Sequence, residues 1–239
     1  MLKVSVIVTN YNYGPFLERC LRSLLSQSMP RDEYEVIVVD DGSTDNSRDV
    51  IESFGDNIAP IFVTNGGVAK ASNIGIQAAK APFVMRVDAD DYVNPHTLLV
   101  MSEALFWNPD FGFVYCDHFR VDEREERVER IRLNTVDKLY NHGAGILFRK
   151  ANLESLGLYD VDLDNCEDFD LLIRYLKNWD GYHIKMPLYR YSQHGDSLTD
   201  NTQQRTDREN IVRERHNLYP DYTHEASRIF DGKKIDGQD

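Results

Sequence analysis

Strand-sized apolar runs alternate with helical patterns through the first half of the chain. The runs "KVSVIVT", "YEVIVVD", "PIFVT" and "PFVMRVD" are rich in β-branched residues, and between them apolar side chains recur at helical spacing, as in "PFLERCLRSLLSQS". Stretches such as "VIVV" are apolar at consecutive positions, which is typical of strands covered by helices on both faces. The pattern predicts an α/β fold with a mixed, mostly parallel central sheet flanked by helices.

One charged stretch interrupts the pattern in the second half. Residues 120–143 have little apolar periodicity and predict a solvated hairpin or loop. From Thr199 onward the chain is polar, which indicates one helix and then a loose tail. Ser43 and Thr44 are good N-caps and predict a helix from there to Phe54. The other expected elements are helices over 68–79, 95–107 and 167–177, strands over 111–119 and 183–191, and an apolar segment over 143–149.

Composition narrows the class of protein. The chain is 41% hydrophobic and 28% charged, which is typical of a soluble globular protein. Its apolar runs are shorter than the roughly 20 residues of a membrane helix, so we expect no transmembrane segment, while peripheral membrane association stays open. The first apolar run lacks a cleavage site and predicts a strand, not a signal peptide. Three widely spaced cysteines favour reduced thiols that fill the core in the cytoplasm.

The formal net charge of −13 restricts the partners. A protein that grips nucleic acid through its phosphates needs basic surface, so we expect no nucleic-acid partner. A small anionic ligand such as a diphosphate remains compatible with the charge. An acidic site would hold it through an intervening metal ion.

Polar side chains gather where three predicted strands end, at 9–12, 40–43 and 88–91. Taken singly, each segment is equally compatible with a helix cap or a turn. Open parallel sheets bind ligands beyond the carboxyl ends of their strands, so the three segments together predict one crevice. Asp88, Asp90 and Asp91 crowd like charges that repel one another unless a cation lies between them.

Other aspartate-rich or phosphate-binding motifs fit poorly. A calcium-binding EF-hand loop that starts at Asp88 needs Gly and Glu where the chain has Val93 and Leu99. The segment "TNYNYGPF" is neither a dinucleotide fingerprint nor a P-loop. An aspartyl-phosphatase remains open from the D-A-D spacing, although such an enzyme usually carries its motif after the first strand, which here ends in Thr9.

Five segments carry a family resemblance in order and spacing: "VSVIVTNYNYGPFLERCLRSLLSQS", "EVIVVDDGSTDNS", "NGGVAKASNIGIQAAKAPFVMRVDADD", "EDFDLLIRY" and "YRYSQHGDSLT". Over roughly Val4 to Thr199 the chain resembles the family 2 glycosyltransferases, inverting enzymes with a GT-A fold. The resemblance implies transfer of a sugar from a nucleotide sugar, most commonly a UDP-sugar, to a hydroxyl of a glycan, lipid-linked or small-molecule acceptor. The Q-x-x-R-W motif of processive synthases is absent from the sequence, so we expect transfer of a single sugar.

The resemblance also implies donor-binding roles. Thr9, Tyr11 and Asp40 match residues that hold the base and ribose of the nucleotide, whereas Asp41-Gly42-Ser43 equally suits a helix cap. Asp88 and Asp90 match the D-x-D motif. The first of these acids contacts ribose or metal-bound water, and the second binds Mg²⁺ or Mn²⁺, hard cations that prefer oxygen ligands. His194 falls where many members place a further metal or phosphate ligand.

Asp168 matches the catalytic base of the family, which takes the proton of the acceptor hydroxyl. Glu167 is expected to bind the acceptor or to orient Arg174. Two acids that open a helix also suit the helix dipole, whatever their chemistry. Many relatives carry Arg where this chain has Ser72, so Lys70 is the expected source of the positive contact.

The resemblance divides the chain into a glycosyltransferase domain over 1–199 and a polar extension over 200–239. Within the domain, the nucleotide-binding half covers about 1–92 and the acceptor-binding half about 93–199. Two alternatives remain at this stage: a sugar nucleotidyltransferase, which usually has a Gly-rich basic loop after its first strand, and a non-catalytic nucleotide-sugar-binding module. The sequence does not specify the sugar, the acceptor or the oligomeric state.

Overall fold

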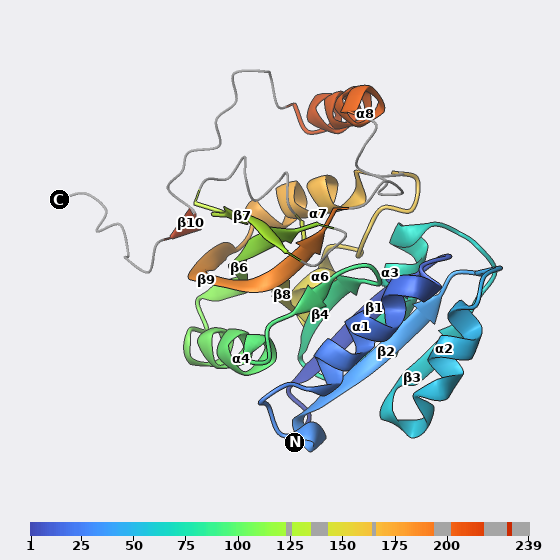
Figure 1. Ribbon diagram of the computed structural model, residues 1–239. Helices are drawn as coiled ribbons and strands as arrows, with labels where there is room; N and C mark the ends of the chain where they lie inside the picture. Colours follow the sequence, from blue (N-terminus) through green and yellow to red (C-terminus); the bar gives the residue numbers. More distant parts are fainter. Residues whose placement is uncertain (123–125, 135–142, 164–165, 194–201, 218–228, 231–239) are drawn as a thin grey trace.

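The computed structural model describes residues 1–122, 126–134, 143–163, 166–193, 202–217 and 229–230 (Figure 1). The strands are β1 (Val4–Asn10), β2 (Tyr34–Asp40), β3 (Ala59–Phe62), β4 (Phe83–Asp88), β5 (Tyr92–Val93), β6 (Phe111–Val121), β7 (Arg127–Ile131), β8 (Ile146–Arg149), β9 (Asp180–Ser192) and β10 (Ile229–Phe230). The helices are α1 (Gly14–Leu25), α2 (Ser47–Ser53), α3 (Val68–Ala78), α4 (Thr97–Trp107), α6 (Lys150–Ser155), α7 (Glu167–Leu176) and α8 (Thr202–Arg215), with short 3-10 turns at Arg31–Glu33 and Gly55–Asn57.

The strands form one mixed sheet in the order β10-β9-β6-β8-β4-β1-β2-β3. Strands β4, β1, β2 and β3 run parallel to their neighbours, whereas β8 is antiparallel to both β4 and β6. Beyond β8, β6 and β9 are again parallel. The sequence prediction of a mixed, mostly parallel sheet is confirmed.

Helices cover both faces of this sheet, because the sheet strands present apolar side chains on both sides (Figure 1). Along β1, Val6 and Val8 pack toward α1, α2 and α4, while Ile7 packs toward α3 and the elements α6 and α7. This alternation follows from the period of two in a strand. The sheet therefore lies between two helical layers, each closed by its own apolar cluster.

Helix α2 begins at Ser47, later than the predicted start at Ser43 or Thr44. The backbone N–H of Ser43 donates to Asp40 Oδ1, and the N–H of Thr44 donates to Asn12 Oδ1. These N–H groups serve the turn that closes the end of β1 against the end of β2. The helix consequently begins three residues after the nearer of the two predicted caps.

The charged stretch after β6 forms a hairpin in its described part, as predicted, because β7 pairs antiparallel with β6 and Arg120 faces Glu129. Cys20, Cys116 and Cys166 are free and buried, in agreement with the predicted role as core fillers. Within the described residues, no helix is long and apolar enough to cross a membrane.

Candidate active site

The three polar strand ends meet at one edge of the sheet. β1 lies between β2 and β4, with Asn10 opposite Asp40 and Thr9 opposite Asp88. Thr9 Oγ1 donates to Asp88 Oδ1 across 3.4 Å. The crevice predicted from the sequence therefore has its polar side chains in adjacent strands, as parallel β/α topology requires.

Asp40 and Asp41 organise the two loops beside β1. Asp40 Oδ2 accepts from Asn10 Nδ2 at 2.8 Å, and its Oδ1 accepts from the backbone of Ser43 at 3.0 Å. Asp41 instead accepts the backbone N–H groups of Gly66 and Gly67 at 2.9 and 2.8 Å. Asp41 thus holds the loop that leads into α3, and not the start of α2 to which the sequence assigned it.

Tyr11 and Lys70 flank this edge as exposed side chains. The ring of Tyr11 lies just beyond β1 and is 46% exposed, so it is accessible to a ligand at the strand ends. Lys70 extends from the first turn of α3 over Gly66, where a Cβ atom would lie 2.5 Å from Lys70 Cδ. Lys70 therefore needs glycine beneath its aliphatic stem.

The three clustered aspartates occupy different environments. Asp88 keeps one third of its side chain exposed, and Asp90 is half-buried, with its carbonyl oxygen accepting from Arg19 Nη2 at 2.7 Å. Asp91 is fully buried; its carboxylate accepts from Tyr189 Oη at 2.7 Å and from the backbone of Ser192 at 2.8 Å. Burial, together with the charge of Asp90, raises the pKa of Asp91 well above its ordinary value. Asp91 thus ties the loop after β4 to the end of β9.

The first turn of α7 brings Glu167 and Asp168 to the same edge, where both contact Arg86 of β4. Arg86 Nη2 lies 2.6 Å from Asp168 Oδ2, Nη1 lies 3.3 Å from Glu167 Oε1, and Nε lies 3.3 Å from Asp88 Oδ1. The chain passes Asp168 closely at Gly143, where a Cβ atom would lie 2.7 Å from Asp168 Cβ. The candidate base and the D-x-D motif are therefore joined through one guanidinium group.

Burial and mutual repulsion change the acidity of this pair. Burial and the neighbouring Asp168 raise the pKa of Glu167 to about 7. Burial also raises the pKa of Asp168, although Arg86 opposes the shift. The carboxylate of Asp168 is thereby suited to accept a proton closer to neutral pH than an ordinary aspartate.

Arg86 is the site residue that sequence reasoning missed. The signal for it is a lone cation inside an otherwise apolar strand, "FVMRVD", since buried charges require partners. Arg174 is not oriented by Glu167, which corrects one sequence expectation. Its Nε atom pairs with Asp170 at 2.7 Å within the same helix.

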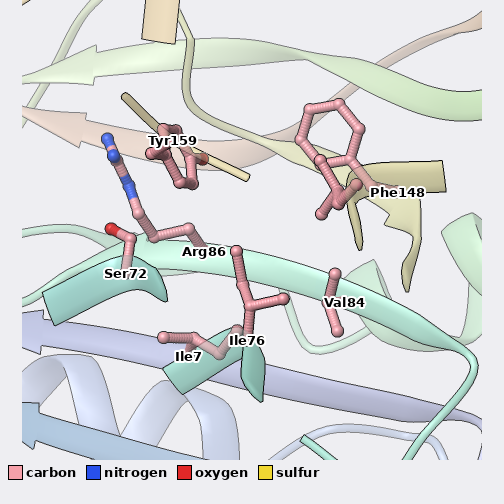
Figure 2. Close-up of a pocket in the computed structure, with 8 residues that line it drawn as sticks. Ile7, Ser72, Ile76, Val84, Arg86, Phe148 and Tyr159 are labelled. Atoms are coloured by element: carbon pink, nitrogen blue, oxygen red, sulfur yellow. The ribbon is translucent and has the colours of Figure 1, made fainter. Parts of the chain in front are cut away.

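Ser72, at the position where relatives often carry Arg, is fully buried in α3 and donates to the carbonyl of Val68. Figure 2 shows its hydroxyl beside the stem of Arg86, below the ring of Tyr159. These side chains line a cavity of about 10 Å³, which is too small for more than about one water. The site therefore has its buried guanidinium on β4 and not on α3.

The donor set suits a hard cation. Asp88 and Asp90 both offer oxygen ligands from partly exposed side chains. His194, the further ligand expected from the sequence, lies outside the described residues. Among the residues that are described, no group of three or more His, Cys, Asp or Glu side chains could by itself hold a metal ion. Oxygens of a bound diphosphate would have to complete the coordination.

The fold and the site together define a nucleotide-sugar transferase class. Residues 5–157 match the family model described as glycosyl transferase family 2, and the chain belongs to this family.

Two curated relatives illustrate the match. An uncharacterized glycosyltransferase from Nostoc sp. is 48% identical over 107 residues, which cover 43% of this chain and 33% of the relative. The poly(ribitol-phosphate) beta-N-acetylglucosaminyltransferase TarS of Staphylococcus aureus is 38% identical over 102 residues, which cover 41% of this chain and 18% of the relative. The matched regions are thus a third or less of these relatives' own lengths.

Solved structures show the same architecture. The crystal structure of S. aureus TarS 1-349 in complex with UDP-GlcNAc has a TM-score of 0.74 at 23% identity and covers 88% of this chain and 65% of that chain. The mannosyltransferase PcManGT from Pyrobaculum calidifontis, in complex with GDP-Man and Mn²⁺, has a TM-score of 0.63 at 22% identity and covers 82% of this chain and 58% of that chain. At these identities the likeness establishes the fold alone, and the GT-A prediction is confirmed.

Proposed function

We propose that this protein is a metal-dependent inverting glycosyltransferase that moves a single sugar from a nucleotide-sugar donor to a hydroxyl acceptor. A UDP-sugar is the proposed donor, and a glycan, lipid-linked or small molecule is the proposed acceptor. The observation that carries the proposal is the link from Asp168 through Arg86 to Asp88 at the strand ends. The bound nucleotide sugars of TarS and of the mannosyltransferase support the choice of donor class.

The donor would lie along the ends of β1, β2 and β4. Thr9, Tyr11 and Asp40 are proposed to hold its base and ribose, and Lys70 to approach its phosphates. Asp90 and His194 would hold Mn²⁺ or Mg²⁺, with Asp88 beside them. When bound, this ion neutralises the charge that develops on the leaving diphosphate.

Asp168 is proposed as the general base. As the acceptor oxygen attacks the anomeric carbon, its proton passes to the carboxylate of Asp168. The bond from that carbon to the diphosphate oxygen breaks, and the nucleoside diphosphate leaves with the electron pair. Attack opposite the leaving group inverts the anomeric centre. Glu167 is proposed to contact the acceptor.

We further propose that 1–92 form the donor half, 93–199 the acceptor half and 200–239 an extension, and that the protein works in the cytoplasm. The first listed sequence feature behind the last proposal is the cysteine usage, and the three thiols are free in the structure. Association with a membrane surface is compatible with a lipid-linked acceptor.

Two variants test the assignment by separating binding from chemistry. Asp168→Asn keeps the shape but removes the proton acceptor, so transfer should fall about 10²–10⁴-fold while donor affinity barely changes. Asp90→Asn should weaken donor binding and transfer together, since its contact exists in the ground state as well. Calorimetry measures affinity, and release of nucleoside diphosphate at saturating donor measures transfer.

The same assay separates the alternatives. A sugar nucleotidyltransferase would form or consume pyrophosphate, and a binding module would bind donor without releasing nucleoside diphosphate. If Asp168→Asn retains near-full transfer, Asp168 is not the base.

A further inference from the structure

Arg86 places each of its three guanidinium nitrogens against a different carboxylate. The distances are 2.6 Å to Asp168, 3.3 Å to Glu167 and 3.3 Å to Asp88, and only 13% of the Arg86 side chain is exposed. A planar guanidinium presents donors in several fixed directions, whereas the ammonium of lysine is a point charge on a flexible stem. Arginine is therefore the side chain that this three-way arrangement requires.

The surroundings fix Arg86 in place. Its guanidinium lies 5.5 Å from the ring centre of Tyr159, and its stem shares the narrow cavity with Ser72 (Figure 2). Because that cavity holds only about 10 Å³, little space exists for another rotamer of a chain as long as arginine. The backbone of Arg86 is paired to Ile7 in the centre of the sheet.

The three carboxylates belong to different parts of the site. Asp88 ends β4 on the donor side, whereas Glu167 and Asp168 open α7 on the side of the base. We propose that Arg86 is the positioning residue of this site, which fixes the carboxylate of Asp168 relative to the donor phosphates at Asp88. This inference rests on the proposed function, since it assigns Arg86 a role in the same transfer.

The arrangement also decides which acid of the pair carries the charge. Arg86 is nearer to Asp168 than to Glu167, and Glu167 Oε2 is buried with no hydrogen-bond partner among the described residues. The groups that face Asp168 within the described chain are Arg86 and Asp88 of β4, Glu167 of α7 and the hydroxyl of Tyr159. Arg86 is the cation among them, so it favours the ionised form of Asp168 that a base needs.

Arg86→Lys tests this role, because it keeps the charge and loses the three-way geometry. We expect kcat to fall about 10²-fold, as for a misplacement of roughly 1 Å in an active site, with donor affinity within about twofold of wild type. The acidic limb of the kcat profile should move to higher pH. Arg174→Lys is the matched control: it alters an Arg–Asp pair of 2.7 Å in the same helix α7 and should leave kcat and its pH profile unchanged.

The outcomes separate this inference from the proposed function. An active wild type together with unchanged kcat in Arg86→Lys overturns the positioning role. Parallel losses of donor affinity and kcat also overturn it, because Arg86 would then be a phosphate ligand. If Arg86→Lys does not fold, Arg86→Met replaces it in the same assay.

A wild type that releases no nucleoside diphosphate from any donor contradicts the proposed function instead. The effect of Arg86 on its neighbour is then measured without turnover, by NMR titration of the Asp168 carboxyl in the free protein. An upward shift of its pKa in Arg86→Lys supports the interaction, and an unchanged pKa overturns it.

Discussion

Glu167 lies beside an acidic neighbour at a position with almost no access to water. Its pKa of about 7 means that the folded protein holds a proton that the unfolded chain releases at about 4.5. Where the folded state binds more protons, raising the pH destabilises it. A residue placed for the acceptor site therefore reduces stability at neutral pH.

Glu167→Gln should remove this pH dependence. The free energy of unfolding of the wild type should fall, relative to the variant, as the pH rises from about 4.5 to about 7. The expected difference is on the order of 2 kcal/mol, because each unit of pKa shift corresponds to about 1.4 kcal/mol. Urea denaturation at pH 5 and pH 8 measures it. Parallel curves for the two proteins would show that Glu167 does not titrate in this way.

At the residue scale, the sequence predicted which chemistry gathers at the strand ends but not how the residues divide it. The pattern brought Thr9, Asp40 and Asp88 to one edge, since parallel strands end together. It could not distinguish Asp91, whose partners Tyr189 and Ser192 come about 100 residues later. Arg86 was missed because its partners on α7 are likewise distant in sequence and become neighbours only through folding.

Among the elements, β6, β7 and β9 share one buried polar contact. Asp117 of β6 accepts from His183 of β9 at 2.8 Å, from Arg130 of β7 at 2.8 Å and from the backbone of Leu133 at 3.1 Å. Burial acts to raise the pKa of Asp117, but these hydrogen bonds outweigh it and hold the pKa below its ordinary value. One carboxylate thus holds the hairpin onto the sheet.

Asp117→Asn should destabilise the protein by about 1.5–3 kcal/mol at pH 7, the usual contribution of hydrogen bonds to a charged group. Since its pKa is lowered by folding, the contribution of Asp117 is present above the ordinary pKa of about 3.9 and is lost as the pH falls through the folded value. Urea denaturation at pH 7 and pH 3 should show a gap that narrows in acid. Exposed Asp56→Asn is the control, and an equal loss in both variants would contradict the assignment.

The elements themselves followed closely from the sequence, because helical and strand periods differ and both were clear. The start of α2 did not, since Asn12 and Asp40 bind the N–H groups that Ser43 and Thr44 would otherwise have offered to a helix. Tertiary hydrogen bonds outweighed a good local cap. Strand β7 was foreseen only as a hairpin or loop, because its side chains are mostly exposed and carry no apolar period.

For the molecule as a whole, the net charge of −13 opposes binding of any free diphosphate. We therefore expect a nucleoside diphosphate to bind far more tightly with Mn²⁺ or Mg²⁺ than with EDTA, because the ion offsets the repulsion between the ligand and the acidic site. Calorimetry under both conditions measures this. Equal affinities would contradict the metal bridge, whereas loss of the metal effect in Asp90→Ala would locate it.

Helix α8 joins the predicted extension to the domain. Val212 is fully buried, and His216 Nε2 lies 2.7 Å from Asp170 Oδ1 on α7. The polar composition that suggested a separate extension thus conceals an apolar contact at one position. A sequence pattern detects repeated burial well and a single buried residue poorly, so the role of 200–239 remained open at the sequence level.

The burial of Asp91 has a consequence for mutational surveys of the acidic triplet. Substituting any of the three aspartates would lower activity in a cell-based screen, but Asp91 would do so by releasing the end of β9 from the loop after β4. An abundance measurement made alongside the screen would divide the triplet: Asp91 variants would be depleted from the soluble fraction, while Asp88 and Asp90 variants would accumulate as intact, inactive protein.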